Sequence, residues 1–123
     1  MVQTPYQRGQ KIQWRAQKEL EKEGYHTMIG ARSLGPFDII AWHRDPGLFI
    51  QVKSCSTKKF YFVKGELEKI IGEKIPEKCS KEIWIWIKNR GWRKWRYIPK
   101  DLHWELLLNR TKLILPKFHK KPF

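Results

Sequence analysis

The stretch Gly35–Ser54, GPFDIIAWHRDPGLFIQVKS, decides the fold of this chain. It contains two short segments rich in apolar and aromatic residues, 37–42 and 48–54. Residues 44–47, Arg-Asp-Pro-Gly, lie between them and carry a turn signal. We therefore expect two strands that form a hairpin with a loop of ordinary length.

Three polar residues, Asp38, Gln51 and Lys53, interrupt these apolar strands. Because strand side chains alternate between the two faces of a sheet, Gln51 and Lys53 share one face. Asp38 lies on that face if the numbers of directly opposed residues sum to an odd number, as they do when Asp38 is opposite Lys53. A slip of one residue would turn Asp38 to the other face.

An acid, an amide and a lysine on one sheet face suit metal-dependent hydrolysis. Mg²⁺, or Mn²⁺ in its place, takes oxygen ligands such as the Asp38 carboxylate and the Gln51 amide oxygen. Lys53 could orient the attacking water or offset negative charge on a phosphate. The simpler alternatives are that Asp38 satisfies backbone groups at a strand start, and that Gln51 and Lys53 are ordinary polar strand residues.

Composition points to an anionic partner. The chain has 123 residues, enough for one domain, and a net charge of +14. Such a charge favours nucleic acid as the partner. No apolar run approaches the length of a membrane span, and no signal-peptide core is visible. Two lone cysteines read as reduced thiols, so we expect a cytoplasmic protein without a membrane partner.

The remaining sequence predicts an α/β fold in which helices flank a mixed central β-sheet. The segment 82–88, EIWIWIK, is apolar on both faces, with isoleucines on one and tryptophans on the other, and so predicts a central strand. The tryptophan face would cover a core or a dimer interface. The other expected elements are helices at 8–23, 66–74 and 99–108, strands at 25–29, 92–98 and 113–115, and a short apolar segment at 60–63.

The order of these motifs resembles the PD-(D/E)xK nuclease superfamily. There, a Pro-Asp opens one strand and an acid-x-Lys tripeptide lies on the next. Here the first motif reads Pro36-Phe37-Asp38 and the second Gln51-Val52-Lys53. Within the superfamily the chain looks most like the archaeal Holliday junction resolvases, across residues 8–108. The further matching residues, in order, are Gly9, Arg32-Ser33 and Trp95-Arg96-Tyr97-Ile98-Pro99.

The resemblance implies a restriction-endonuclease-like core in a single domain, 1–123, with a basic tail at 116–123. It implies catalytic roles for Asp38, Gln51 and Lys53, and metal ligation by Asp38, Gln51 and Gln13. Gln13 matches the family's helical glutamate, and Gln51 its second acid, so two expected carboxylates are amides here. An amide oxygen can ligate a cation but brings no charge.

The activity implied by the resemblance is endonucleolytic hydrolysis of DNA, with branched DNA as a candidate substrate, by a homodimer. The alternative is a protein that has lost catalysis and retains nucleic-acid binding on the same fold. Basic and aromatic residues suit RNA as well as DNA. The candidate nucleic-acid contacts are Arg8, Lys11, Arg15, Arg32, Ser33, Arg93 and Lys94. A solvated helix face and an ordinary hairpin are the alternative explanations for these basic residues.

Overall fold

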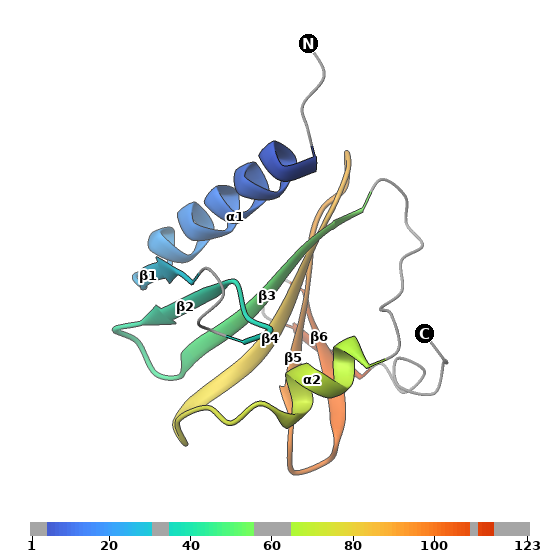
Figure 1. Cartoon of the computed structure of the whole chain (residues 1–123). Helices are drawn as coiled ribbons and strands as arrows, with labels where there is room; N and C mark the ends of the chain where they lie inside the picture. The colour runs from blue at the N-terminus through green and yellow to red at the C-terminus, as the bar shows by residue number, and fades with distance from the viewer. Residues whose placement is uncertain (1–4, 31–34, 56–64, 109–110, 115–123) are drawn as a thin grey trace.

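The computed structural model describes residues 5–30, 35–55, 65–108 and 111–114, which form two helices and a seven-stranded sheet (Figure 1). The elements are α1 (Pro5–Lys22), β1 (His26–Ile29), β2 (Ile39–Trp42), β3 (Gly47–Cys55), α2 (Glu66–Gly72), β4 (Cys79–Ile87), β5 (Gly91–Ile98), β6 (His103–Leu108) and β7 (Thr111–Ile114).

The strands are arranged in the sheet in their sequence order, from β1 at one edge to β7 at the other. All neighbouring pairs are antiparallel except β3 and β4, which are parallel. A parallel pair needs a crossover connection, and α2 lies within it. The sheet is therefore mixed, and this confirms the predicted α/β class.

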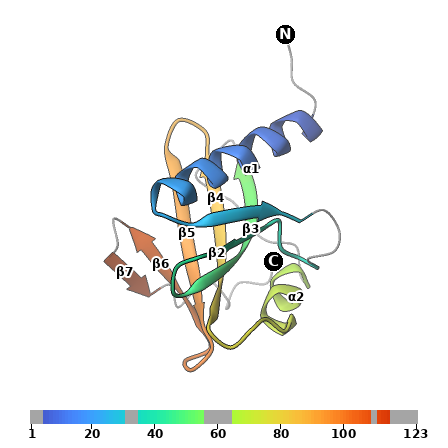
Figure 2. The ribbon, with the colours of Figure 1, turned by 90° about the vertical axis from the view of Figure 1, so that its left-hand side faces the viewer.

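Helix α1 covers one face of the sheet (Figure 2). Ile12, Ala16 and Leu20 recur at a four-residue step, and all three are buried. They belong to one apolar cluster with Ile50 and Val52 of β3. The helix starts at Pro5, earlier than the predicted residue 8. Proline is well tolerated in the first helical turn, where its missing N–H would have no partner.

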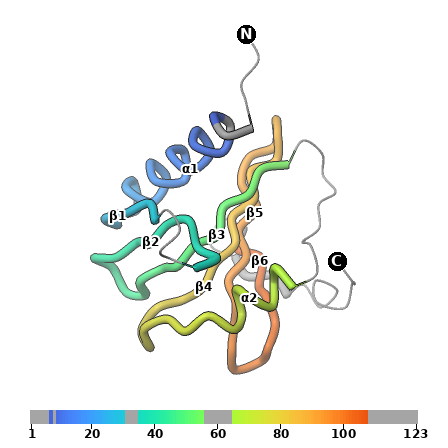
Figure 3. Tube along the Cα trace, viewed as in Figure 1, coloured from blue at the N-terminus to red at the C-terminus, as the bar shows by residue number. Residues whose placement is uncertain are grey.

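Helix α2 covers the opposite face, as the trace in Figure 3 makes visible. Its buried residues Leu67 and Ile70 pack in a second apolar cluster with Ile83 and Ile85 of β4 and with Trp95 of β5. The helix ends at Gly72, two residues before the predicted end. The two helices thus enclose β3 and β4 from both sides.

Strand β4 is buried on both faces, as its sequence predicts. Its isoleucines belong to the cluster under α2, while Trp84, only 2% exposed, belongs to the cluster under α1. Trp86 packs against the same cluster under α1, and its ring centroid lies 5.2 Å from that of Trp92. Of the two roles open to Trp84, the structure shows the core role.

The predicted helix at 99–108 is wrong, because β6 occupies residues 103–108 and pairs with β5. Leucines at 102, 106 and 107 imitate a helical period. However, Leu102 is 70% exposed, while Trp104 is fully buried against Tyr97, with ring centroids 5.2 Å apart. Pairing with β6 also gives β5 a hydrogen-bonded neighbour that a helix could not supply.

Candidate functional site

Asp38 lies at the point where β2 begins. Its backbone N–H donates to the carbonyl of Ile50 at 2.8 Å. Its side-chain Oδ2 accepts a hydrogen bond from the backbone N–H of Val52, also at 2.8 Å. The carboxylate therefore occupies a position on the β3 backbone where a strand carbonyl would otherwise bind. This replacement fixes the carboxylate beside the middle of β3.

The strand register brings Asp38 and Gln51 opposite one another. Ile39 pairs with Ile50, so the next opposed position beyond β2 joins residues 38 and 51. The register given as an example in the sequence analysis placed Asp38 opposite Lys53, two residues further along β3 than the observed partner. Because side chains alternate with a period of two, a two-residue shift leaves Asp38, Gln51 and Lys53 on the same face.

Lys53 lies between the strand and α2. Its ammonium group forms an ion pair with the carboxylate of Glu66, the first residue of α2. The two side chains are 31% and 29% exposed, so water reaches the pair only in part. Lys53 is also close enough to Asp38 for its positive charge to act on that carboxyl. One lysine thus interacts with carboxylates from two different elements.

Burial dominates the electrostatics of Asp38. Desolvation raises the pKa of its carboxyl above the ordinary value, although the Val52 N–H and the charge of Lys53 both act to lower it. An ionised carboxyl at this place therefore gains from additional positive charge nearby. A bound cation would supply such charge, and a carboxylate oxygen is a ligand that hard divalent ions accept.

The donors beside Asp38 differ from a carboxylate-rich metal centre. Within residues 5–30, 35–55, 65–108 and 111–114, no three His, Cys, Asp or Glu side chains come together as possible ligands. The strands provide one carboxylate, from Asp38, and one amide, from Gln51. These oxygen donors fit a divalent cation in kind, and any further negative charge for such an ion would come from another element.

Gln13, the third predicted ligand, lies half-buried on α1 next to Ile12. Ile12 packs with Val52 on the face that α1 covers, whereas Gln51 and Lys53 point to the other face. No hydrogen bond joins Gln13 to Asp38 or Gln51 in the described part of the chain. Ligation by Gln13 stays a prediction.

The predicted nucleic-acid contacts lie in several environments. Lys11 is exposed on α1, whereas the guanidinium of Arg15 stacks 4.3 Å from the ring centroid of Trp86. Lys94 is ion-paired with Glu19 at 2.9 Å and lies over the ring of Trp84. The backbone of Arg8 is in α1. The loop residues Arg32 and Ser33, the segment 60–63 and the tail 116–123 lie outside the described residues.

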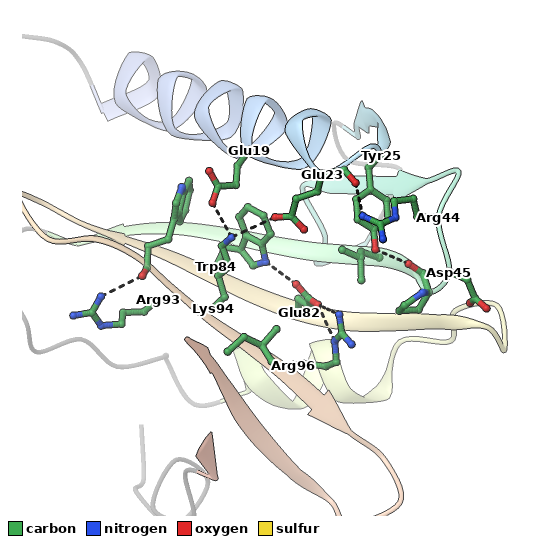
Figure 4. A pocket seen from close by; sticks show the side chains of 14 residues that line it. Glu19, Glu23, Tyr25, Arg44, Asp45, Glu82, Trp84, Arg93, Lys94 and Arg96 are labelled. Atoms are coloured by element: carbon green, nitrogen blue, oxygen red, sulfur yellow. Dashed lines mark hydrogen bonds and ion pairs between the residues drawn. The ribbon is translucent and has the colours of Figure 1, made fainter. Parts of the chain in front are cut away.

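On the α1 face, a polar cleft of about 740 Å³ contains Lys94 and a buried carboxylate that the sequence did not reveal (Figure 4). Glu82 is 2% exposed. Its carboxylate accepts from Nε and Nη2 of Arg96, at 2.8 and 2.6 Å, and from Nε1 of Trp84 at 2.7 Å. These hydrogen-bond partners are side chains of β4 and β5, so the role of Glu82 is to link these two strands. The signal that could have revealed this pair is the cross-strand register of Glu82 and Arg96.

Comparisons with known proteins agree on one family. The family model described as archaeal Holliday junction resolvase (Hjc) matches residues 4–109. The crossover junction endodeoxyribonuclease Hjc of Methanocaldococcus jannaschii is 35% identical over 66 residues, covering 54% of this chain. That match spans about half the relative's length, 49%.

A solved structure supports the same fold. Hjc of Archaeoglobus fulgidus, a Holliday junction resolvase from an archaeal hyperthermophile, superposes with a TM-score of 0.62 at 21% identity. The match covers 71% of this chain and 70% of that one. At this identity the likeness establishes the architecture: a mixed sheet with helices on both faces.

Proposed function

Because this chain belongs to the archaeal Holliday junction resolvase family, whose model matches residues 4–109, we propose that it is a structure-specific DNA endonuclease. It would hydrolyse phosphodiester bonds in branched DNA, in particular four-way junctions. The observation that carries the proposal is the grouping of Asp38, Gln51 and Lys53 on one face of β2 and β3, next to the start of α2.

A divalent metal, Mg²⁺ or Mn²⁺, would be held by the carboxylate of Asp38 and the amide oxygen of Gln51. When bound, such an ion supplies positive charge to the phosphate and lowers the pKa of a coordinated water. Asp38 is suited to this role because its Oδ2 is fixed by the Val52 N–H and its charge is only partly compensated.

Lys53 would contribute a second positive charge at the reacting phosphate. Its side chain shares a face with Gln51 and interacts with the Asp38 carboxyl. A fixed ammonium group stabilises the negative charge that develops on phosphate oxygens during hydrolysis. The ion pair with Glu66 restrains the position of the ammonium before DNA binds.

The net charge of +14 supports DNA as the partner. None of the helices in the described part of the chain is long and apolar enough to cross a membrane. Resolving a junction requires two symmetric cuts, so the active species would be a homodimer with twofold symmetry. Sedimentation measurements would test this assembly, and a strict monomer at high concentration would contradict junction resolution.

The test of the activity is cleavage of labelled four-way junction, flap, single-stranded and linear duplex DNA in Mg²⁺ and in Mn²⁺. We expect preferential cleavage of the junction, lost in Asp38→Ala and in Lys53→Ala. Gel retardation of the same DNA by all three proteins would show that binding is intact.

The second candidate is a nucleic-acid-binding protein without catalysis, favoured by amides at positions 13 and 51 where the family has acids. It predicts DNA retardation without metal-dependent cleavage of any of the four substrates. An RNA four-way junction included in the retardation assay would separate a DNA-directed from an RNA-directed protein.

A further inference from the structure

The strands that carry the candidate site are short of negative charge. Asp38, directly before β2, brings one carboxylate, while Gln51 on β3 is neutral. Divalent cations such as Mg²⁺ are usually bound through one or two carboxylates, and affinity rises with the charge of the ligand set. A second carboxylate near Asp38 would therefore matter for metal binding, and it need not come from β3.

Glu66 brings a carboxylate to the same face from α2. Its ion pair with Lys53 fixes the direction of the side chain toward β3. Lys53 in turn acts electrostatically on Asp38. The ammonium of Lys53 thus lies within range of two carboxylates, and it balances part of their charge in the protein without metal or DNA.

The fold holds Glu66 in this position. The next residue, Leu67, is buried, as is Ile70 one turn later, so the start of α2 is packed against the sheet. Gly65, immediately before, has a φ of 92°, a conformation that glycine adopts without strain and that lets the chain turn into the helix. Glu68, two residues after Glu66 on the same helix, is exposed.

We propose that Glu66 supplies the second carboxylate of the metal site, in place of the acid that is missing at Gln51. The ligand set from the protein is then the Asp38 and Glu66 carboxylates with the Gln51 amide oxygen. The inference rests on the proposed endonuclease function and names a residue that the strand motif does not contain. With Glu66 held by such a cation, Lys53 would be available to contact a phosphate of the DNA.

Binding of Mn²⁺ alone, measured by electron paramagnetic resonance without DNA, tests this assignment. Glu66→Gln should weaken Mn²⁺ binding on the order of tenfold or more. The matched control Glu68→Gln, on the same helix, should bind as the wild type does. Equal affinity of Glu66→Gln and wild type would overturn the proposal, and so would a wild type that binds no Mn²⁺. Circular dichroism and melting temperature show whether each variant is folded.

Two further variants separate a metal ligand from a residue that acts only through Lys53. In a Lys53→Met background, the Glu66→Gln change should still weaken Mn²⁺ binding by a similar factor. If the effect disappears there, Glu66 only positions the lysine and the proposal fails. Conversely, Gln51→Glu combined with Glu66→Gln should regain most of the lost affinity, because the charge returns to the site from β3.

Failure of this inference can be told apart from failure of the proposed function. Junction cleavage by the wild type, together with unchanged Mn²⁺ affinity in Glu66→Gln, would retain the nuclease and reject the ligand. In the reverse result, the wild type cleaves no substrate, but the Glu66→Gln variant binds Mn²⁺ more weakly than the wild type. This result would retain the metal site and reject the endonuclease.

Discussion

Replacing Glu82 by leucine should destabilise the protein strongly, because it removes a buried carboxylate with three donors. Oε2 accepts from Arg96 at 2.8 and 2.6 Å, and Oε1 accepts from Trp84 at 2.7 Å. Removing one partner of a buried ion pair costs roughly 3–5 kcal/mol. The Arg96 side chain is 23% exposed and can regain some hydration. We therefore expect the lower end, about 3 kcal/mol, a large part of the ~5–15 kcal/mol that stabilises a typical domain.

The assay is equilibrium unfolding in urea, followed by tryptophan fluorescence. The double variant Glu82→Leu with Arg96→Met should recover most of the loss, since an apolar pair of similar volume needs no compensating charge. The exposed pair Lys18–Glu21, with side chains 50% and 45% exposed, gives the control. Glu21→Gln should change the free energy of unfolding by less than about 0.5 kcal/mol.

Two outcomes would refute the reasoning on Glu82. One is a loss in Glu82→Leu no larger than in the Glu21→Gln control. The other is strict additivity, in which the double variant loses the sum of the two single losses. Additivity would mean that Glu82 and Arg96 contribute independently, despite the short contacts between them.

Three further predictions concern single side chains. Burial raises the pKa of Asp38 above its unfolded value. The stability that the protonated carboxyl contributes is therefore complete below the unfolded pKa, and it is lost as pH rises through the folded pKa and the buried carboxyl ionises. Asp38→Asn should therefore be more stable than wild type in urea titrations at pH 7 with chelator, and the gain should shrink toward pH ~4; a constant gain would contradict this. Lys11→Gln should weaken junction-DNA binding more than Lys94→Gln in fluorescence anisotropy, since Glu19 already neutralises Lys94; equal losses would contradict this. Leu102→Gly should raise stability by roughly 0.5–1 kcal/mol: Leu102 is exposed and has a φ of 53°, which costs a non-glycine residue about 1–2 kcal/mol, and the greater freedom of glycine in the unfolded chain offsets roughly 0.5–1 kcal/mol of the gain. A thermal melt showing destabilisation would contradict this.

The hairpin of β2 and β3 shows how far periodicity leads. Alternation of apolar and polar residues was enough to predict that Gln51 and Lys53 share a face, whereas Asp38 joins them only when opposed residue numbers sum to an odd number, as they do in the structure. The register itself is that of the paired β2 and β3 backbones, and the bond from the Val52 N–H to the Asp38 carboxylate accompanies it; no local pattern reveals either. A shift of two residues along β3 leaves the three side chains on the same face, so the predicted face was right although the example pairing of Asp38 with Lys53 was not the observed one.

Other features could not be read from local sequence because distant segments create them. Glu66 reaches Lys53 only because the crossover through α2 returns to the face of β3. The leucines of β6 imitate a helical period, and the burial of Trp104 against β5 decides in favour of a strand. In both cases the deciding contact joins residues from different elements, and the sequence pattern does not predict that these residues meet.

The two faces of the sheet differ in how their charges are satisfied, and this difference bears on where DNA would bind if the proposed function is right. On the α1 face, Glu82 is bound to Arg96, and Lys94 to Glu19, so these cations already have carboxylate partners. A phosphate there would have to displace an existing ion pair. On the α2 face, Lys53 is paired as well, with Glu66, but burial leaves the charge of Asp38 incompletely balanced, and in the proposed metal site a bound cation would take over Glu66 so that Lys53 could contact a phosphate. The scissile phosphate is therefore expected on the α2 face.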